Sequence, residues 1–151
     1  MPEIALFQPD IAPNAATIIR MAACFGLKTT IIEPAGFAWT DSSFRRAGMD
    51  YLSRAQLSRS PSWEEFYQTK GTRRLILVTT KAEEAYHRFH FRPDDILLMG
   101  QEGSGVPESV HNAADARLVI PMRPGERSLN VALACAIVTA ECLRQTGGFG
   151  S

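Results

Sequence analysis

Three segments of the chain combine glycines, prolines and polar side chains in ways that could serve binding or catalysis. They are residues 13–20, 100–107 and 120–130. The middle segment, Gly100-Gln101-Glu102-Gly103-Ser104-Gly105-Val106-Pro107, has three glycines within six residues, which allows sharp turns and close backbone approach to a ligand. It contains neither the Gly-Lys-Ser/Thr of a Walker loop nor a Gly-x-Gly-x-x-Gly fingerprint. Its glycines and the Glu102 carboxylate therefore predict a ligand loop of another kind.

The two flanking segments place polar side chains near the starts of expected helices. We expect Asn14 to cap the first of these helices and Ser128 to cap the second. Asn130, close to the second helix start, can still offer its amide to a ligand. Arg20 follows Asn14 by six residues, and taken alone it is typical of an exposed helical arginine.

Other common kinds of site are disfavoured by the residues present. The loop at 8–14 lacks glycine, which argues against pyrophosphate binding by the usual dinucleotide fold. His87 and His90 could share a helical face, but no further His, Cys or Asp completes a zinc site, so we expect no metal. No Ser-His-Asp or Cys-His arrangement for nucleophilic catalysis is evident.

The composition is typical of a folded protein. Hydrophobic residues make up 45% of the chain, and its length predicts one domain over residues 1–151. The longest strictly apolar run, residues 131–138, is far shorter than a membrane span. The cysteines form no CxxC pair and Met1-Pro2-Glu3 lacks signal-peptide features, so we expect a cytoplasmic protein. Cys135 and Cys142, one heptad apart on an apolar helix, are expected in the core.

The charge is balanced overall but unevenly placed. Sixteen basic and sixteen acidic residues give zero net charge, which argues against a generic polyanion binder. Arginines nevertheless cluster, opposed by a single aspartate, at Arg45, Arg46, Arg54 and Arg59. Planar guanidinium groups suit bidentate phosphate contacts, although a solvated face or an arginine bias of the gene would give the same pattern.

The elements that must position these residues alternate along the chain. Short apolar or β-branched runs predict strands at 4–7, 29–32, 75–78, 96–99 and 118–120. Helices are expected at 14–25, 43–47, 62–71, from Pro107 onward, and at 128–145. This alternation predicts an α/β fold with a largely parallel sheet and helices on both faces. Ligands of such folds bind beyond the carboxyl ends of the strands, where the three segments lie.

Taken in order, five stretches resemble the SPOUT superfamily of RNA methyltransferases, in particular its small TrmL (YibK-like) type. They are Pro13-Asn14 with Arg20, residues 31–39, residues 45–51, residues 100–107, and Ile120-Pro121-Met122 with Ser128-Leu129-Asn130. Members of this type methylate the 2′-hydroxyl of the wobble ribose, of cytidine or uridine, in tRNA. The resemblance covers nearly the whole chain, and the G-x-E-x-x-G-x-P and I-P-M…S-x-N motifs occurring in this order are specific.

The resemblance implies a C-terminal trefoil knot, a homodimer, and S-adenosylmethionine as methyl donor without a metal. It implies cofactor contacts at Val78, Gly100, Glu102, Gly105, Ile120, Met122 and Ser128. The implied catalytic residues, which would face the target ribose, are Arg20, Glu102 and Asn130. The implied contacts to the tRNA anticodon stem-loop are Arg20, Arg45, Arg46 and Arg54. Because arginine has a high pKa, we expect Arg20 to hold phosphate and stabilise charge rather than act as a base.

One stretch departs from the family pattern. Between Asn14 and Arg20 the family usually has Thr-Gly-Asn, where this chain has Ala15-Ala16-Thr17. Replacing glycine by a good helix former predicts an earlier helix start, and the change bears on substrate recognition rather than on cofactor binding. An alternative is therefore a non-catalytic protein of the same fold that binds RNA or S-adenosylmethionine. A Rossmann-like oxidoreductase is weakened by the missing glycines.

Overall fold

The sheet is the frame on which the site is built. The computed structural model describes residues 1–38, 42, 46, 55–126 and 128–150. Within them one seven-stranded sheet, parallel at every pairing, has the order β3-β2-β1-β6-β4-β7-β5. The strands are β1 Glu3–Phe7, β2 Lys28–Ile32, β3 Gln56–Ser60, β4 Leu75–Val78, β5 Glu84–Ala85, β6 Ile96–Met99 and β7 Ala116–Val119.

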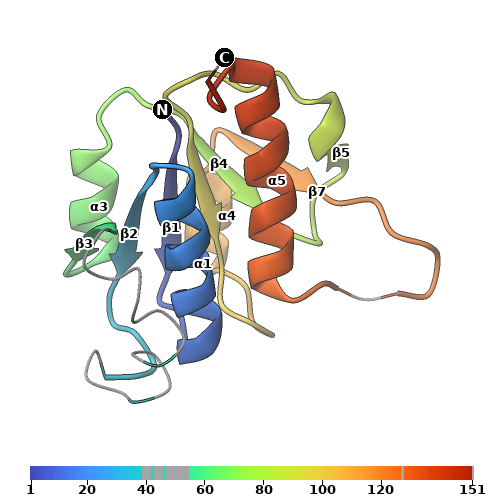
Figure 1. Cartoon of the computed structure of the whole chain (residues 1–151). Coiled ribbons are helices and arrows are strands. Elements are labelled where there is room, and N and C mark those ends of the chain that lie inside the picture. The colour runs from blue at the N-terminus through green and yellow to red at the C-terminus, as the bar shows by residue number, and fades with distance from the viewer. Residues whose placement is uncertain (39–41, 43–45, 47–54, 127, 151) are drawn as a thin grey trace.

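Helices cover both faces of this sheet, so the predicted α/β class is confirmed (Figure 1). The helices are α1 Ala12–Cys24, α3 Trp63–Thr69, α4 Glu108–Ala113 and α5 Val131–Thr146, with a 3-10 turn η1 at Tyr86–Arg88. Helices α1 and α5 pack on one face, and α3 and α4 pack on the other. Among the described residues, none of the helices is both long enough and apolar enough to cross a membrane.

The continuous apolar runs follow from this two-sided cover. Successive residues of a strand point to opposite faces. In β1, Ile4 and Leu6 join the core beneath α1 and α5, whereas Ala5 and Phe7 join the core that includes Phe66 of α3. Every residue of β6 is buried for the same reason.

Two helix caps differ from the prediction. Helix α1 begins at Ala12 and no side chain caps it, so Asn14 lies inside the first turn instead of capping the helix. The expected earlier start is thereby confirmed. Asn130 caps α5, and the expectation that Ser128 would do so was wrong. Asn130 directly precedes the first helical residue and reaches the exposed N–H groups of the first turn, whereas Ser128 lies two residues too early.

Other local predictions have mixed outcomes. The hydroxyl of Ser62 caps α3 by accepting from the Glu65 N–H at 3.2 Å, as its spacing predicted. Gly26 follows α1 with a φ of 71°, as expected of a helix stop. Strand β3 was not expected, because its residues carry no apolar run. Of the helix expected at 43–47, only Arg46 lies within the described residues.

The strand order places three loops at one edge of the sheet. The chain moves outward from β1 to β2 and β3, then crosses to β4, and β6 later fills the space between β1 and β4. Strands β6, β4 and β7 are thus neighbours, and their carboxyl ends point the same way. The segments at 100–107 and 120–130 follow two of these ends, at the kind of position where α/β folds bind ligands.

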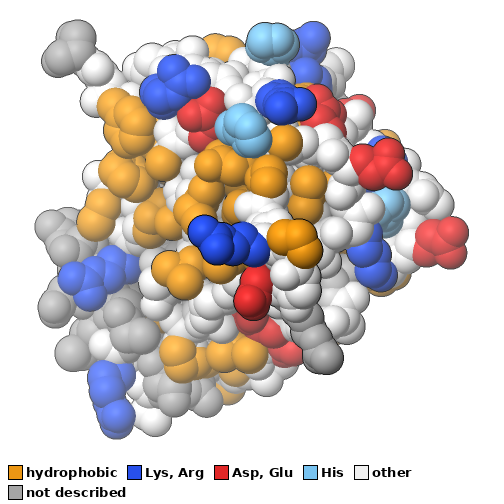
Figure 2. Space-filling view, turned by 90° about the vertical axis from the view of Figure 1, so that its right-hand side faces the viewer, with side chains coloured by type: hydrophobic (Ala, Val, Ile, Leu, Met, Phe, Trp, Pro, Cys, Tyr) orange, Lys and Arg blue, Asp and Glu red, His pale blue; other side chains and the backbone are white. Residues whose placement is uncertain are grey.

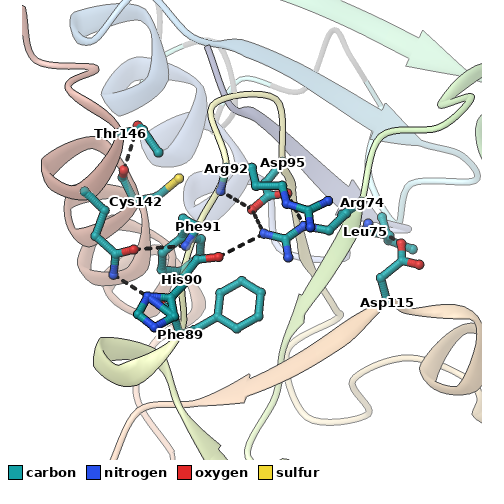
Figure 3. Close-up of polar contacts among 11 residues, drawn as sticks. Arg74, Leu75, Phe89, His90, Phe91, Arg92, Asp95, Asp115, Cys142 and Thr146 are labelled. Carbon is teal, nitrogen blue, oxygen red and sulfur yellow. Dashed lines mark hydrogen bonds and ion pairs between the residues drawn. The ribbon is translucent and has the colours of Figure 1, made fainter.

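A buried polar network fixes the opposite, amino-terminal end of the same strands (Figure 3). Arg74 donates to both carboxylate oxygens of the fully buried Asp95, at 2.8 and 2.6 Å. Asp95 also accepts from the N–H of Arg92 at 2.8 Å, and Arg74 donates to the carbonyl of His90 at 3.0 Å. Gln145 of α5 bonds the backbone of the same loop. These contacts tie the loop before β6 to β4 and α5.

Candidate active site

A cavity of about 460 Å³ opens at the carboxyl ends of β4, β6 and β7. All seven residues that the resemblance implied as cofactor contacts line it: Val78, Gly100, Glu102, Gly105, Ile120, Met122 and Ser128. The cavity is also lined by residues outside that set of seven: Leu77, Thr79, Thr80, Met99, Gln101, Gly103, Val106, Leu129, Val131 and Ala134. The structure therefore gathers the glycine-rich loop and the lead-in to α5 around one space; what that space binds stays a prediction.

The glycine-rich loop folds back on itself at the mouth of this cavity. Gln101 and Gly105 exchange backbone hydrogen bonds of 2.9 and 3.1 Å across the turn. Gly100 has no room for a side chain, because a Cβ there would lie 2.7 to 2.9 Å from three backbone atoms of Gly105. The side-chain amide of Gln101 donates to the carbonyl of Gln8 at 2.9 Å, which joins this loop to the end of β1. The glycines thus give the loop its shape.

Three polar side chains from distant parts of the chain meet at the edge of the cavity. Asn14 Nδ2 of α1 donates to Glu102 Oε1 at 2.7 Å. Asn130 Nδ2 donates to Asn14 Oδ1 at 3.1 Å. We expected Asn14 to cap its helix and named it in the family resemblance without a role of its own, and nothing in its sequence neighbourhood indicates this contact with a residue 88 positions away. Asn14 is the functional candidate that sequence reasoning missed.

The environment of Glu102 favours its protonated form more than water does. Partial burial raises the pKa of this carboxyl above its usual range, and the negative charge of Asp10 raises it further. Hydrogen bonds from Asn14 and from the backbone of Val131 act in the opposite direction. Glu102 is therefore a carboxylate of increased basicity at the rim of the cavity.

Of the arginines predicted to act on RNA, the two that the structure describes, Arg20 and Arg46, do not line the cavity. Arg20 lies exposed on α1, about 9 Å along the axis and about 120° around it from Asn14. Arg46 is exposed. Arg45 and Arg54 lie outside the described residues.

The histidines considered as metal ligands do not share a helix. His87 belongs to η1, which ends at Arg88, and His90 follows it in the loop before β6. Within the described ranges, no three His, Cys, Asp or Glu side chains gather as a metal site would require. Cys135 and Cys142 are buried in the core, as predicted.

A family model settles which group of proteins this arrangement belongs to. The model described as the SpoU rRNA Methylase family matches residues 1–140. The chain belongs to the SpoU rRNA methylase family. Solved structures agree with this SpoU membership. One, from a study of 2′-OH methylation of C/U34 on tRNA, superposes with a TM-score of 0.92 at 34% identity, covering 96% of this chain and 95% of that one.

Two curated relatives are similar over nearly their full length, and one further solved structure over part of its length. A tRNA (cytidine(34)-2′-O)-methyltransferase of Beijerinckia indica subsp. indica is 58% identical over 146 residues, 95% of this chain and 91% of the relative. One of Escherichia coli K12 is 38% identical over 149 residues, 97% of this chain and 95% of the relative. The SpoU methyltransferase AviRb of Streptomyces viridochromogenes, solved with AdoMet, is 26% identical with a TM-score of 0.79, covering 96% of this chain and 60% of that one.

The stretch Ala15-Ala16-Thr17, which differs from the pattern that the resemblance implies, has a structural explanation. Ala15 and Ala16 are buried in the core beneath α1, where small side chains let the helix approach the sheet. Thr17 is exposed, and its hydroxyl bonds the carbonyl of Pro13 at 2.8 Å within the helix. The two alanines thus serve packing and leave Asn14 directed at Glu102.

Proposed function

We propose that this chain transfers a methyl group from S-adenosylmethionine to the ribose 2′-hydroxyl of nucleotide 34, cytidine or uridine, in tRNA. The proposal treats residues 1–151 as one methyltransferase domain. The observation that carries it is the cavity at the carboxyl ends of β4, β6 and β7, with Glu102 at its rim. Relatives named for this reaction, at 58% and 38% identity over nearly the whole chain, support it.

The residues of the cavity fit a nucleoside-type methyl donor. Its volume lies in the range of small-molecule sites, and its lining mixes apolar side chains with glycine and serine backbone. Gly100 and Gly105 allow backbone groups to approach a planar base or a sugar closely. The Glu102 carboxylate offers a negative charge toward a sulfonium. Bound S-adenosylmethionine would supply a methyl group that is already activated toward a nucleophilic oxygen.

The protein then has to position the ribose and stabilise charge. Glu102, held by Asn14, would orient the 2′-hydroxyl through a hydrogen bond. Asn130 would hold Asn14 in place. Arg20 would contact the neighbouring phosphate, since a guanidinium stays charged and binds phosphate in a fixed geometry.

We propose that the chain acts as a homodimer. Three hydrophobic side chains spaced four residues apart, Leu129, Leu133 and Ile137, are 37%, 58% and 36% exposed along one side of α5 and its lead-in. Ile11, before α1, is also exposed. The apolar composition of this helix is compatible with either a core or an interface position. The buried side of α5 is formed by other residues, which favours an interface for Leu133 and Ile137, whereas Leu129 also lines the cavity.

The tRNA surface is proposed around Arg20 and Arg46, with Arg45 and Arg54 still as predictions. The face that includes β5 and β7 carries hydrophobic side chains across its middle, and its Lys and Arg side chains are scattered among acidic ones (Figure 2). A phosphate backbone favours gathered positive charge. This contrast supports placing the RNA elsewhere than on the β5 and β7 face.

We also propose that the C-terminal segment forms the trefoil knot implied by the resemblance. What supports this is that residues of the loop beginning at Gly100 and of the loop beginning at Ile120 line one cavity, so the two chain segments that a knot would interlace lie close together.

Methyl transfer to tRNA from a strain lacking this protein tests the function. Labelled S-adenosylmethionine should label the tRNA, and mass spectrometry of nuclease fragments should place the 2′-O-methyl group at nucleotide 34. Binding of S-adenosylmethionine by calorimetry without any transfer would instead support the non-catalytic alternative. Failure of both would contradict the proposed function.

A further inference from the structure

Three loops lie next to one another at the edge of the sheet where the cavity opens. They follow β6, β1 and β2, and these strands are neighbours in the sheet, with β1 in the middle. The glycine-rich loop after β6 lines the cavity, whereas residues 8–11 after β1 and residues 33–36 after β2 do not. The parallel sheet thus places the glycine-rich loop beside two loops that lie outside the cavity.

The loop after β1 is held from both sides through the backbone of Gln8. This residue has a φ of 43°, in the left-handed region that residues other than glycine rarely adopt. Such a conformation persists only where the surrounding contacts hold it. The N–H of Gln8 donates to the carbonyl of Ile32 at 2.8 Å, and its carbonyl accepts from the side-chain amide of Gln101 at 2.9 Å. Gln8 therefore connects the end of β2 to the glycine-rich loop.

The Gln101 amide is oriented by this contact. The carbonyl of Gln8 can only accept, so Gln101 presents its Nε2 to it and its Oε1 faces another group. That group is the hydroxyl of Ser104, which donates to Oε1 at 2.6 Å within the turn. A hydroxyl can rotate to suit its partner, whereas a backbone carbonyl cannot, so Gln8 sets the orientation.

The glycine-rich loop needs a contact of this kind because its own backbone is permissive. Three of its residues between positions 100 and 105 are glycines, which lose the most conformational freedom when a loop is ordered. A second contact to the loop after β1 joins the N–H of Glu102 to Oδ1 of Asp10 at 3.4 Å, longer than the roughly 2.7–3.2 Å of an ordinary hydrogen bond. Gln101 therefore provides the shorter and stronger of these two connections.

We infer that Gln101 is a positioning residue for methyl-donor binding: it holds the glycine-rich loop against the loop after β1, and through it against the loop after β2. This inference rests on the proposed function, because it takes S-adenosylmethionine as the occupant of the cavity. A loop that is held in its binding shape loses less conformational freedom when the ligand binds. The affinity for the donor therefore depends on residues outside the cavity.

The loop after β2 takes part through close packing at Gly36. Its N–H donates to the carbonyl of Pro9 at 2.8 Å. A Cβ at position 36 would lie 2.9 Å from the Cα of Asp10, so a side chain there has to displace the backbone of residues 8–11. Gly36 is exposed and does not line the cavity. It therefore offers a way to move the loop after β1 without touching the donor site.

Gln101→Met removes the connection with a side chain of similar length that has no N–H. The Kd for S-adenosylmethionine, measured by calorimetry, should rise about 3- to 10-fold, as the loss of one hydrogen bond predicts. The KM for the donor should rise by the same factor. The kcat at saturating donor should stay within about twofold of the wild type, because the bound donor then holds the loop. A general loss of folded protein would lower kcat as well.

Gln56→Met is the matched control. The amide of Gln56 also donates to a backbone carbonyl, that of Gly26 at 3.3 Å, but Gln56 begins β3 and so lies at the opposite, amino-terminal edge of the sheet. The same chemical change there should leave the Kd and the KM for S-adenosylmethionine unchanged.

A double-mutant cycle tests whether the loops act through Gln101. Gly36→Ala should raise the Kd for S-adenosylmethionine about 3- to 10-fold in the wild-type background, because it moves the carbonyl that Gln101 contacts. In the Gln101→Met background, Gly36→Ala should change the Kd by less than about twofold, since the connection is already lost. Fold-changes that multiply instead would show that the loop after β1 acts by another route, and would overturn the role of Gln101.

The outcomes separate this inference from the proposed function. Thermal unfolding curves verify that each variant is folded, and the Gln101→Met comparison stands alone if Gly36→Ala is not. A wild-type protein that binds S-adenosylmethionine while Gln101→Met binds it equally well would refute the inference and leave the proposed function intact. A wild-type protein that binds no S-adenosylmethionine would instead contradict the proposed function.

Discussion

Gly100 offers the sharpest test of how the glycine-rich loop shapes the cavity. In Gly100→Ala the new Cβ would lie 2.7 to 2.9 Å from three backbone atoms of Gly105. Carbon atoms in ordinary contact are about 3.5–4.0 Å apart, so the backbone at position 100 and the backbone at Gly105 must separate by about 1 Å. Because both contacting groups are backbone, no side chain can move aside to make room.

The separation breaks the two backbone hydrogen bonds that close the turn, Gln101 N–H to Gly105 O at 2.9 Å and Gly105 N–H to Gln101 O at 3.1 Å. Each hydrogen bond is worth about 0.5–1.5 kcal/mol, so the loop conformation that lines the cavity should be destabilised by about 1–3 kcal/mol. At about 1.4 kcal/mol per tenfold, the affinity for S-adenosylmethionine should fall about 5- to 150-fold. The core should remain folded, because β6 ends at Met99 before the altered residue.

Calorimetric titration with S-adenosylmethionine measures the loss, and a thermal unfolding curve verifies that the variant is folded. Ser104→Ala is the control on the same loop, since Ser104 is exposed and does not line the cavity. It should bind within about twofold of the wild type, because a solvent-exposed hydrogen bond contributes little. A Gly100→Ala protein with wild-type affinity would refute the packing argument for this turn.

Two further substitutions and one labelling experiment address the proposed interface, the buried ion pair and the cysteines. Leu133→Asp, at a side chain that is 58% exposed on α5, should convert the proposed dimer to a monomer in light scattering after gel filtration; an unchanged mass would place any interface elsewhere. A thiol reagent should label only Cys24 in the native protein, because burial raises the pKa of the other two thiols to about 12; peptide mass spectrometry reads this out. Arg74→Met leaves the buried Asp95 charge unpaired and should lower the free energy of unfolding in urea by about 3–5 kcal/mol; a loss below about 1 kcal/mol would show that the charge finds other partners.

Much of the fold could be predicted because its strands carry a strong local signal. Residues 75–78 and 96–99 are apolar throughout, and this pattern is typical of parallel strands covered on both faces. Strand β3, by contrast, is an edge strand of mostly polar residues, and β5 has only two residues. Neither has the length or hydrophobicity from which a strand is predicted. They are strands because their backbones pair with those of β2 and β7, respectively.

The position of the cavity could be predicted from the sequence, but the strand order that creates it could not. Loops after parallel strands converge at one edge, so the segment holding Gly100 and the segment holding Ser128 were expected to face one ligand. The strand order is what makes them neighbours, and it cannot be obtained from local patterns: β6 is inserted between β1 and β4 although it comes later in the chain. The family resemblance supplied the residues expected to share one site but no strand order, and residue periodicity supplied neither.

The contact between Asn14 and Glu102 shows why local rules misplace a functional residue. An asparagine before an apolar periodic stretch is most often a helix cap, and this expectation ignores what the neighbouring loop offers. Here Pro13 lies in the first turn, where its missing N–H costs nothing, and α1 begins at Ala12 without a side-chain cap. The amide of Asn14 is then not needed by its own helix.

A helix start that does not use its asparagine leaves that amide free to bridge two other elements. Ala15 and Ala16 keep α1 close to the sheet, so the first turn stays within hydrogen-bonding reach of the loop after β6. If this closeness matters, a larger residue at position 16, which is fully buried, should push α1 outward and lengthen the contact between Asn14 and Glu102. Ala16→Val should then reduce kcat even though residue 16 does not line the cavity and makes no contact with Glu102. A variant with intact kcat would show that the contact between Asn14 and Glu102 tolerates movement of the helix.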